Sequence, residues 1–365
     1  MRSRRETTMG SSRQAGRRAG IAAIGAGARV EGSGSGSAGS RRGVMRAVVQ
    51  EAYGAADVLH LAEIDRPDIA ANEVLVQVRG AGVDRGTWHQ MTGRPYLMRV
   101  IGFGLRGPKQ RVPGLDVAGT IVAVGSQVTR FQAGDEVFGI ARGSFAEYAA
   151  ARQDKLVHKP ASLGFQQAAV VAVSGVTALQ GLRDAGRVQP GQQVLVIGAS
   201  GGVGTFAVQL AKAFGAQVTG VCSTAKVDLV RSLGADQVID YTREDFADGV
   251  RRYDLILDIG RDSRLSRLRR ALASKGTLVI VGGEGGKWIG MARQLRALVL
   301  SPFVRQRLTM FIARQRQADL EALRRFIEAG QVAPIVGAAY PLAEVPDALR
   351  HLEAGQARGK LAITI

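Results

Sequence analysis

The sequence predicts an α/β protein made of two differently built domains, one rich in β-strands and one with a doubly wound parallel sheet. From residue 45 to about residue 165, short apolar runs are separated by Gly, Pro and Asp turns, a pattern typical of a compact β-rich domain. From there to residue 282, apolar strands alternate with helical stretches, which favours a parallel sheet that binds its ligand beyond the strand carboxyl ends. A chain of 365 residues is long enough for both domains.

The same patterns place the individual strands. Two late strands, within Ile335–Leu342 and at Lys360–Ile365, are expected to return to the first domain, which then comprises residues 45–165 and 331–365 around a second domain of residues 166–330. In the β-rich part we expect strands at Met45–Gln50, Glu73–Ala81, Gly119–Val124, Glu136–Ile140 and Phe145–Ala150. In the second part we expect strands at Val194–Ile197, Gln217–Cys222, Gln237–Ile239, Asp254–Ile259 and Thr277–Val281.

A glycine-rich turn between a strand and a helix is the first candidate binding site. Val194–Gly204 reads VLVIGASGGVG, an apolar strand followed by glycines at G-x-x-G-x-x-G spacing, and a helix is expected over Val203–Phe214. Such a turn lets the backbone approach a pyrophosphate and points the positive end of the helix dipole at it. Glycine-rich turns also occur as plain loops, but the strand–helix–strand context favours a dinucleotide. The candidate residues are Gly198, Ala199, Ser200, Gly201, Gly202, Val203 and Gly204.

The end of the following strand bears on the choice of cofactor. A site that prefers NAD places an acidic residue there to hold the ribose hydroxyls, whereas this chain has Ser223, Thr224 and Lys226. Hydroxyls and an ammonium group suit the 2′-phosphate of NADPH, which a carboxylate would repel. The alternative is that Ser223 and Thr224 cap a helix starting near Ala225 while Lys226 lies on its solvated face.

In addition, a series of motifs resembles the zinc-independent quinone oxidoreductase branch of the medium-chain dehydrogenase/reductase family. The resemblance implies a GroES-like catalytic domain, a Rossmann domain, and hydride transfer from a nicotinamide held between them. It covers nearly everything after Met45. The motifs that carry it are Pro113–Gly125, Phe131–Gly139, Ser144–Ala149, Lys159–Ala169, Ile197–Ala216 and Leu233–Tyr241.

The resemblance also implies roles for single residues. Asp84 and Arg85 stand where relatives carry Asn and Pro beside the nicotinamide, so Asp84 is a candidate to polarise a cofactor hydroxyl or relay a proton; a local ion pair with Arg85 is the alternative. Trp88, Met91 and Tyr96 are candidates for the apolar wall of a pocket for a flat substrate, with simple packing as the alternative. Further cofactor contacts are implied for Ser174, Thr177, Tyr241, Gly282, Gly283 and Lys360.

No metal site is expected. Relatives that use zinc supply a Cys early in the catalytic domain and a Gly-His-Glu stretch, where this chain has no Cys and reads Gly114, Leu115 and Asp116. The single cysteine, Cys222, lies in the other domain, and the histidines are scattered. Without a Lewis acid, a conjugated acceptor is favoured over an ordinary alcohol because it delocalises the charge that hydride brings.

Most of the net charge of +18 sits in two stretches. Residues 1–44 and Lys287–Arg316 each carry seven net positive charges, which leaves four for the rest of the chain. We expect residues 1–44 to be disordered, and we favour a translation start at Met45 over a transit peptide or an RNA-binding arm. The second stretch, residues 287–316, has near-helical apolar spacing, for which a packed or dimer-forming helical pair is favoured over contact with an anionic membrane.

Together these features predict a cytoplasmic, NADPH-dependent, zinc-independent oxidoreductase that transfers a hydride to a quinone, enone or other reactive carbonyl compound. A homodimer is expected, and a specific nucleic-acid partner is not. No stretch is apolar and long enough to predict a transmembrane helix. The alternatives are a metal-free alcohol or aldehyde dehydrogenase, and a low-turnover NADPH-binding regulator that contacts RNA or a membrane.

Overall fold

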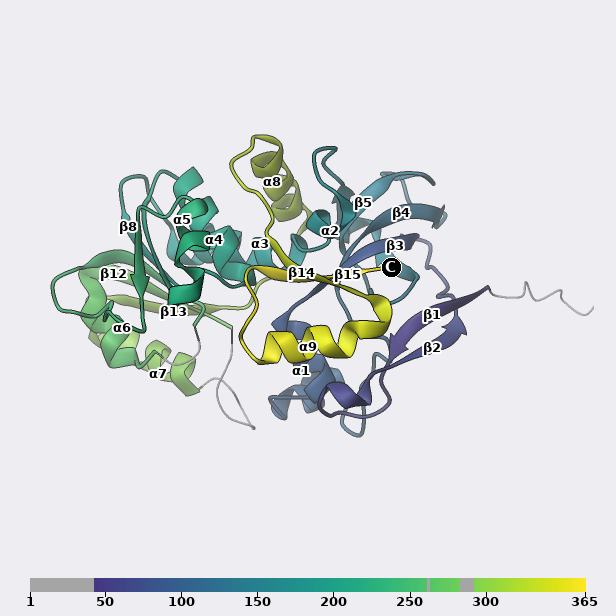
Figure 1. Cartoon of the computed structure of the whole chain (residues 1–365), viewed down its shortest axis with the longest axis horizontal. Coiled ribbons are helices and arrows are strands. Elements are labelled where there is room, and N and C mark those ends of the chain that lie inside the picture. Colours follow the sequence, from purple (N-terminus) through teal and green to yellow (C-terminus); the bar gives the residue numbers. More distant parts are fainter. Residues whose placement is uncertain (1–42, 261–262, 283–291) are drawn as a thin grey trace, which may run out of the picture. The chain divides into compact units, whose positions relative to one another are not determined.

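The structure is a computed structural model that describes residues 43–260, 263–282 and 292–365 (Figure 1). The expectation for residues 1–42 and the candidate Gly283 therefore lie outside the described residues. In the part that is described, no helix is both long and apolar enough to cross a bilayer.

The first part of the chain forms a mainly antiparallel sheet of seven strands in the order β14-β15-β3-β4-β5-β7, with β6 paired to β3. Its core is built by alternation, because Val74, Val76 and Val78 of β3 all point into one cluster with Ile121 and Val137. β1 (Val44–Val49) and β2 (His60–Asp65) form a separate antiparallel pair. The sheet strands are β3 (Glu73–Val83), β4 (Asp116–Val124), β5 (Glu136–Ile140), β6 (Tyr148–Arg152), β7 (Leu156–His158), β14 (Val336–Pro341) and β15 (Lys360–Thr364).

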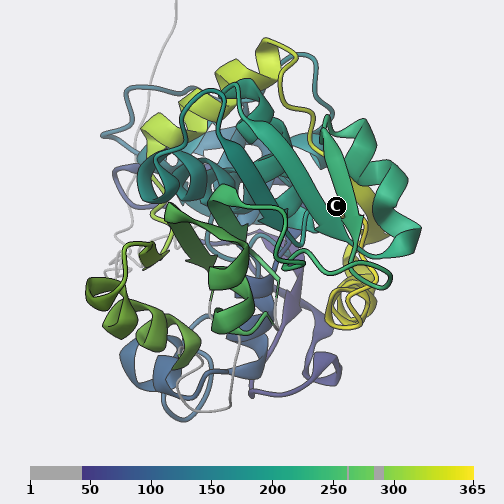
Figure 2. The same cartoon turned by 90° about the vertical axis from the view of Figure 1, so that its left-hand side faces the viewer.

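The second sheet is parallel throughout, with six strands in the order β10-β9-β8-β11-β12-β13 (Figure 2). The chain starts at β8 in the middle and winds outward in both directions, so β8 and β11 flank the point where the winding reverses. The strands are β8 (Gln193–Ile197), β9 (Gln217–Cys222), β10 (Gln237–Asp240), β11 (Tyr253–Asp258), β12 (Leu272–Val281) and β13 (Arg307–Phe311).

Both faces of the parallel sheet are covered, which is why its strands are continuously apolar. Val194 and Val196 of β8 pack into a cluster with α3, α4, α5 and α8, whereas Leu195 and Ile197 pack into another with α6 and α7. The predicted fold class is therefore confirmed. The helices are α1 (Arg85–Thr92), α2 (Phe165–Ala168), α3 (Ala172–Gln180), α4 (Gly202–Ala213), α5 (Val227–Ser232), α6 (Leu265–Ala271), α7 (Ala292–Leu300), α8 (Gln317–Glu328) and α9 (Val345–Glu353).

The last two strands lie in the first sheet. β15 pairs antiparallel with β3, with Leu361 opposite Val83, and β14 runs parallel to β15 on its other side. The chain thus leaves the first sheet, builds the parallel sheet, and comes back to the first. The residue bounds predicted for the two domains stay predictions.

In its described residues, the basic stretch 287–316 does not form the predicted pair of helices. Within its described residues, helix α7 ends at Leu300 and Arg307–Phe311 form the edge strand β13. The residues of β13 pair in register with Thr277–Val281 of β12, and Leu308 is buried. Tertiary pairing therefore overrides the helical spacing of the apolar residues here.

Several element bounds also differ from prediction. The predicted strand at Phe145–Ala150 begins only at Tyr148, because Phe145 and Glu147 bond instead to the β1 backbone at Val48 and Arg46. The fold begins before Met45, since Val44 pairs with Asp65. β2, β7 and β13 were not predicted.

Cys222 offers a test of this fold. The residue is 2% exposed at the end of β9, and burial, together with the nearby Asp240 carboxylate, raises the pKa of its thiol to about 11. At pH 8 only about one thiol in a thousand is then ionised, so a disulfide reagent should label the native protein at least about 100-fold more slowly than the unfolded chain.

Because the folded chain holds this proton more tightly than the unfolded chain, the group's contribution to the unfolding free energy falls as pH rises from about 9. The chain has one cysteine, so thiol release on unfolding reports on a single site. Equal labelling of native and denatured protein at pH 8 would show that the end of β9 is open.

Candidate cofactor site

The glycine turn joins β8 to α4 with the geometry that an anion requires. Gly198 has φ +84°, and a Cβ on Gly204 would lie 2.1 Å from the Gly198 carbonyl oxygen, so these two positions need glycine. The N-cap of α4 is Gly201, which has no side chain to cap the first turn. A Cβ on Gly201 would meet only the Gly198 oxygen, at 3.5 Å, and otherwise open space. The helix end is therefore open to an external anion.

The segment before β15 lies directly on this turn. Gly359 donates its N–H to the Ser200 carbonyl oxygen at 2.8 Å and forms a bridge with Gly201. The stem of Lys360 lies against Gly202, because a Cβ there would be 2.8 Å from Lys360 Cδ. Ser174 Oγ of α3 lies 3.3 Å from the same point. The structure thus brings the predicted residues Ser174, Gly202 and Lys360 together, although they come from three separate stretches.

The Lys360 ammonium is buried beside two carboxylates. Its Nζ lies 2.8 Å from Asp116 Oδ2 and 4.0 Å from Asp84 Oδ2, and all three residues are at most 5% exposed. Asp116 Oδ1 accepts a further hydrogen bond from the Val173 backbone at 2.7 Å. Burial raises the pKa of the Asp116 carboxyl to about 6; the Lys360 ammonium opposes this rise and Asp84 adds to it. We call Asp84, Asp116 and Lys360 the buried charge cluster.

Asp84 also has a structural role that the sequence did not indicate. Its Oδ1 accepts the Thr87 N–H at 2.8 Å and so caps helix α1. Its Oδ2 is buried without a hydrogen bond in the described part of the chain. Arg85, the partner considered in the alternative reading, lies over the Trp88 ring at 5.2 Å and donates to the Leu352 carbonyl oxygen.

The candidate substrate wall is only partly accessible. Trp88 is half-buried against the core of the first part, and its Nε1 is buried without a hydrogen-bond partner among the described residues. Tyr96 is half-buried beneath the Arg99 guanidinium, 4.7 Å from its ring. Met91 is fully buried in the core, so its assignment to an accessible wall is wrong. The sequence around Met91 did not indicate whether its side chain faces the core or a pocket.

A second group of predicted residues gathers at the carboxyl ends of β9 and β10. Thr224 donates its hydroxyl to Asp240 Oδ2 at 2.5 Å, and Tyr241 is 62% exposed. The capping alternative holds only in part: Ser223 is the N-cap residue of a 3-10 turn, Thr224–Lys226, that leads into α5, but its side chain makes no capping bond. Lys226 Nζ donates to the carbonyl oxygens of Gly355 and Ala357 at 3.0 and 2.8 Å.

Arg358 belongs to this group and was missed. Burial and the positive charge of Arg358 both lower the pKa of Lys226, so the two cations are close enough to interact. Arg358 directly precedes Gly359, which lies on the glycine turn. The sequence signal was the Arg-Gly-Lys stretch itself, from which only Lys360 was selected.

The remaining predicted contacts are not drawn together by any interaction in the described chain. Thr177 Oγ1 donates to the Val173 carbonyl oxygen inside α3, at 2.6 Å. Gly282 has φ +78° at the end of β12, and its carbonyl oxygen accepts from Gln294 Nε2 at 2.6 Å. Within residues 43–260, 263–282 and 292–365, no three His, Cys, Asp or Glu side chains are grouped to hold a metal ion.

The residues present fit a nicotinamide dinucleotide. The open N-terminus of α4 suits its pyrophosphate, and hydroxyl and cationic groups lie near the end of β9, one strand away from that turn. Gly204, where a side chain would strike the backbone, keeps the helix tight on its strand. Fold and site together define a dinucleotide-dependent oxidoreductase of the medium-chain type.

Comparison with known proteins identifies the family. Residues 70–161 match the alcohol dehydrogenase GroES-like domain, and residues 233–363 match a family described as zinc-binding dehydrogenase. The chain is 33% identical over 335 residues to a 2-methylene-furan-3-one reductase of Solanum lycopersicum, covering 87% of this chain and 79% of that protein. It is 34% identical over 334 residues to an NADPH-dependent alkenal/one oxidoreductase of Arabidopsis thaliana, with the same coverage.

Among solved structures, the quinone oxidoreductase from Coxiella burnetii matches with a TM-score of 0.79 and 26% identity, over 88% of this chain and 100% of that one. The protein belongs to the quinone oxidoreductase-like branch of the medium-chain dehydrogenase/reductase family.

Two glycine substitutions separate the structural and binding roles of the turn. Gly201→Ala places a methyl group in the open space, so the free energy of unfolding should fall by at most about 1 kcal/mol, while the Kd for the cofactor rises at least tenfold. Gly204→Ala should destabilise the fold itself, because its methyl group strikes the backbone. Urea unfolding and cofactor titration measure the two effects. Normal affinity in Gly201→Ala would show that no phosphate approaches this turn.

Proposed function

We propose that the protein uses NADPH to reduce quinones, enones or related reactive carbonyl compounds, without a metal ion. The observation that carries the proposal is the open N-terminus of α4 with Lys360 packed on its glycine turn, in a chain of this family. When bound, the dihydronicotinamide supplies a hydride. The protein's part is to hold the dinucleotide, orient the acceptor and provide a proton.

Two cations support NADPH over NADH. Lys226 and Arg358 lie close together near Ser223, and a 2′-phosphate placed there would meet positive charge and the Ser223 hydroxyl; the Thr224 hydroxyl already donates to Asp240. The Asp240 carboxylate is the opposing feature, but it already accepts bonds from Thr224 and Thr242. One relative is named as NADPH-dependent.

The donor set supports chemistry without zinc. Asp116, which stands where zinc enzymes of the family carry Glu, uses both carboxylate oxygens internally, on Lys360 and on the Val173 N–H. The one thiol of the chain, Cys222, is buried in the parallel sheet. With no thiolate near Asp116, a conjugated acceptor is favoured because it spreads the incoming charge itself.

We propose Asp84 as the group that passes the proton and Trp88 and Tyr96 as the wall against which a flat acceptor lies. In the buried charge cluster two carboxylates share one ammonium, so its formal net charge is −1. Asp84 Oδ2 is its oxygen without a hydrogen bond. A homodimer, a cytoplasmic location and the absence of a specific nucleic-acid partner stay predictions from the sequence.

A panel of acceptors tests the function. NADPH oxidation should be fastest with quinones and enones, slower with simple aldehydes, and no alcohol should reduce NADP⁺ at a comparable rate.

The Kd for NADPH should be at least tenfold below that for NADH. Arg358→Gln should raise the Kd for NADPH several-fold and leave that for NADH unchanged, because only the 2′-phosphate meets this side chain.

Stoichiometric NADPH binding without turnover on any acceptor would contradict the enzymatic proposal and favour a regulatory protein. Efficient oxidation of small alcohols would favour a metal-free dehydrogenase. Equal affinities for the two cofactors would remove only the preference for NADPH.

Asp84→Asn tests the proton route. Asparagine caps a helix as well as aspartate does, so α1 should be retained and the cofactor Kd should change less than about threefold. Turnover with an enone should fall at least tenfold, because the amide cannot relay a proton. Steady-state kinetics and cofactor titration measure both. Unchanged turnover would assign Asp84 a purely structural role.

A further inference from the structure

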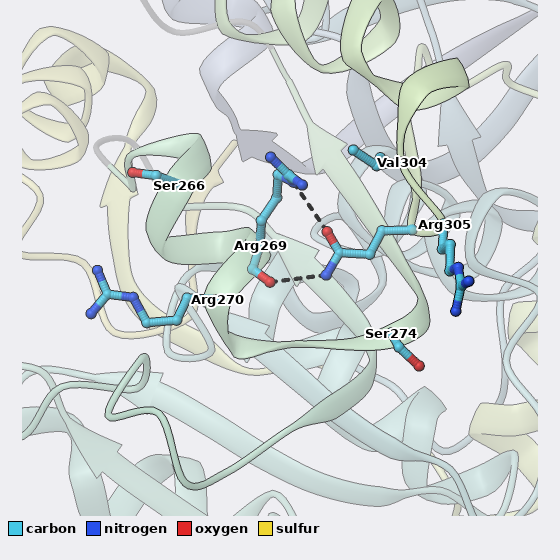
Figure 3. A pocket seen from close by; sticks show the side chains of 7 residues that line it. Ser266, Arg269, Arg270, Ser274, Val304 and Arg305 are labelled. Atoms are coloured by element: carbon cyan, nitrogen blue, oxygen red, sulfur yellow. Dashed lines mark hydrogen bonds between the residues drawn. The ribbon is translucent and has the colours of Figure 1, made fainter.

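A basic pocket lies on the parallel-sheet part of the protein, at the amino-terminal edge of the sheet. It has a volume of about 490 Å³ and is formed by the end of α6, the start of β12 and the segment before β13 (Figure 3). Three arginines and no carboxylate line it. The lining residues are Ser266, Arg269, Arg270, Ser274, Val304, Arg305 and Gln306.

The pocket is organised by Gln306. Its side-chain amide donates to the Arg269 carbonyl oxygen at 2.9 Å, and its Oε1 accepts from Arg269 Nε at 3.1 Å. The first bond satisfies a carbonyl group at the end of α6 that has no partner within the helix, and the second fixes the Arg269 guanidinium (Figure 3). The positive charge of Arg270 helps to lower the pKa of the Asp245 carboxyl, which does not line the pocket. Three positive side chains therefore line the pocket, and no carboxylate is among its lining residues.

An apolar groove of about 550 Å³ adjoins the basic pocket. The outward face of α7 presents Leu295, Leu298 and Val299, whereas its Gln294 and Ala297 point inward and are buried. Val299 is 70% exposed, and Phe303, in the turn that follows, is 81% exposed. The groove is lined by Leu265, Leu295, Arg296, Val299, Leu300 and Phe303.

The two hollows are lined by residues that are neighbours in the sequence. Leu265 lines the groove and its neighbour Ser266 lines the basic pocket. Likewise, Phe303 lines the groove and Val304 lines the basic pocket. The surface therefore presents guanidinium groups beside apolar side chains that are exposed to solvent. This arrangement fits a molecule with an anionic head and an apolar tail.

The basic pocket is separate from the cofactor site. Ser274 lies near the start of β12 and Gln306 directly precedes β13, so the basic pocket is at the amino ends of these parallel strands. The glycine turn follows the carboxyl end of β8, at the opposite edge of the same sheet. The pocket does not belong to the dinucleotide site.

We propose that α6, α7 and the turn through Phe303 form a docking surface for an anionic phospholipid membrane. Lipid phosphates bind in the arginine pocket, and Leu295, Val299 and Phe303 enter the boundary between headgroups and acyl chains. Charge selects this occupant over a second copy of the chain, because a two-fold contact here would bring like-charged arginines together. The proposal goes beyond the reductase function and does not depend on it.

Vesicle flotation of the full chain tests the charged half of the surface. The protein should float with phosphatidylcholine vesicles that contain phosphatidylserine and not with phosphatidylcholine alone. The variant Arg269→Gln/Arg270→Gln/Arg305→Gln should lose at least about tenfold in partitioning. A matched variant, Arg79→Gln/Arg252→Gln/Arg325→Gln, removes the same charge from exposed arginines elsewhere and should retain binding. Equal losses in both would mean that net charge alone drives adsorption.

A second pair of variants, one test and one control, examines the apolar half of the surface. Val299→Ser/Phe303→Ser should lower partitioning at high salt several-fold, whereas Val250→Ser/Ile312→Ser, at positions 83% and 77% exposed, should not. If Val299→Ser/Phe303→Ser instead dissociates an oligomer in sedimentation and leaves flotation unchanged, a second copy covers the groove. If free inorganic phosphate binds the pocket while vesicles do not, its ligand is a free anion. Either result overturns the proposal.

Discussion

The burial of the Lys360 ammonium between Asp116 and Asp84 is the interaction on which the candidate site depends. An ammonium this deeply buried is tolerable only with close negative partners, and Asp116 at 2.8 Å is such a partner. The lysine comes from β15, Asp116 from β4, and the lysine stem rests on Gly202 of the glycine turn. One side chain thereby links the antiparallel sheet to the dinucleotide turn of the parallel sheet.

Features encoded locally could be predicted from the sequence. Continuous apolar runs such as β8 face two cores and read as buried parallel strands, while Gly198 and Gly204 occupy positions that a side chain cannot fill. The return of the last strands to the first sheet was expected from the strand patterns at the end of the chain. In these cases the sequence pattern and the packing express the same constraint.

What escaped prediction depends on partners distant in sequence. Lys226 was assigned to a phosphate from its position alone, yet its ammonium also bonds to carbonyl oxygens some 130 residues away. β13 looks helical until β12 is placed beside it. Likewise, the basic pocket joins Arg269 to Gln306 across 37 positions, so the arginines of α6 were not connected with the basic stretch that follows. Periodicity within one window carries no information about such pairs.

The span of the Lys360–Asp116 pair has a consequence for the order of folding. The two residues are 244 positions apart, whereas the glycine turn is complete within a single strand–turn–helix unit. Closing so long a loop costs conformational entropy before any contact rewards it. The glycine turn can therefore assemble early, while the Asp116 carboxylate stays hydrated until β15 pairs with β3. The charge balance beside the candidate cofactor site is then one of the last properties that the folding chain acquires.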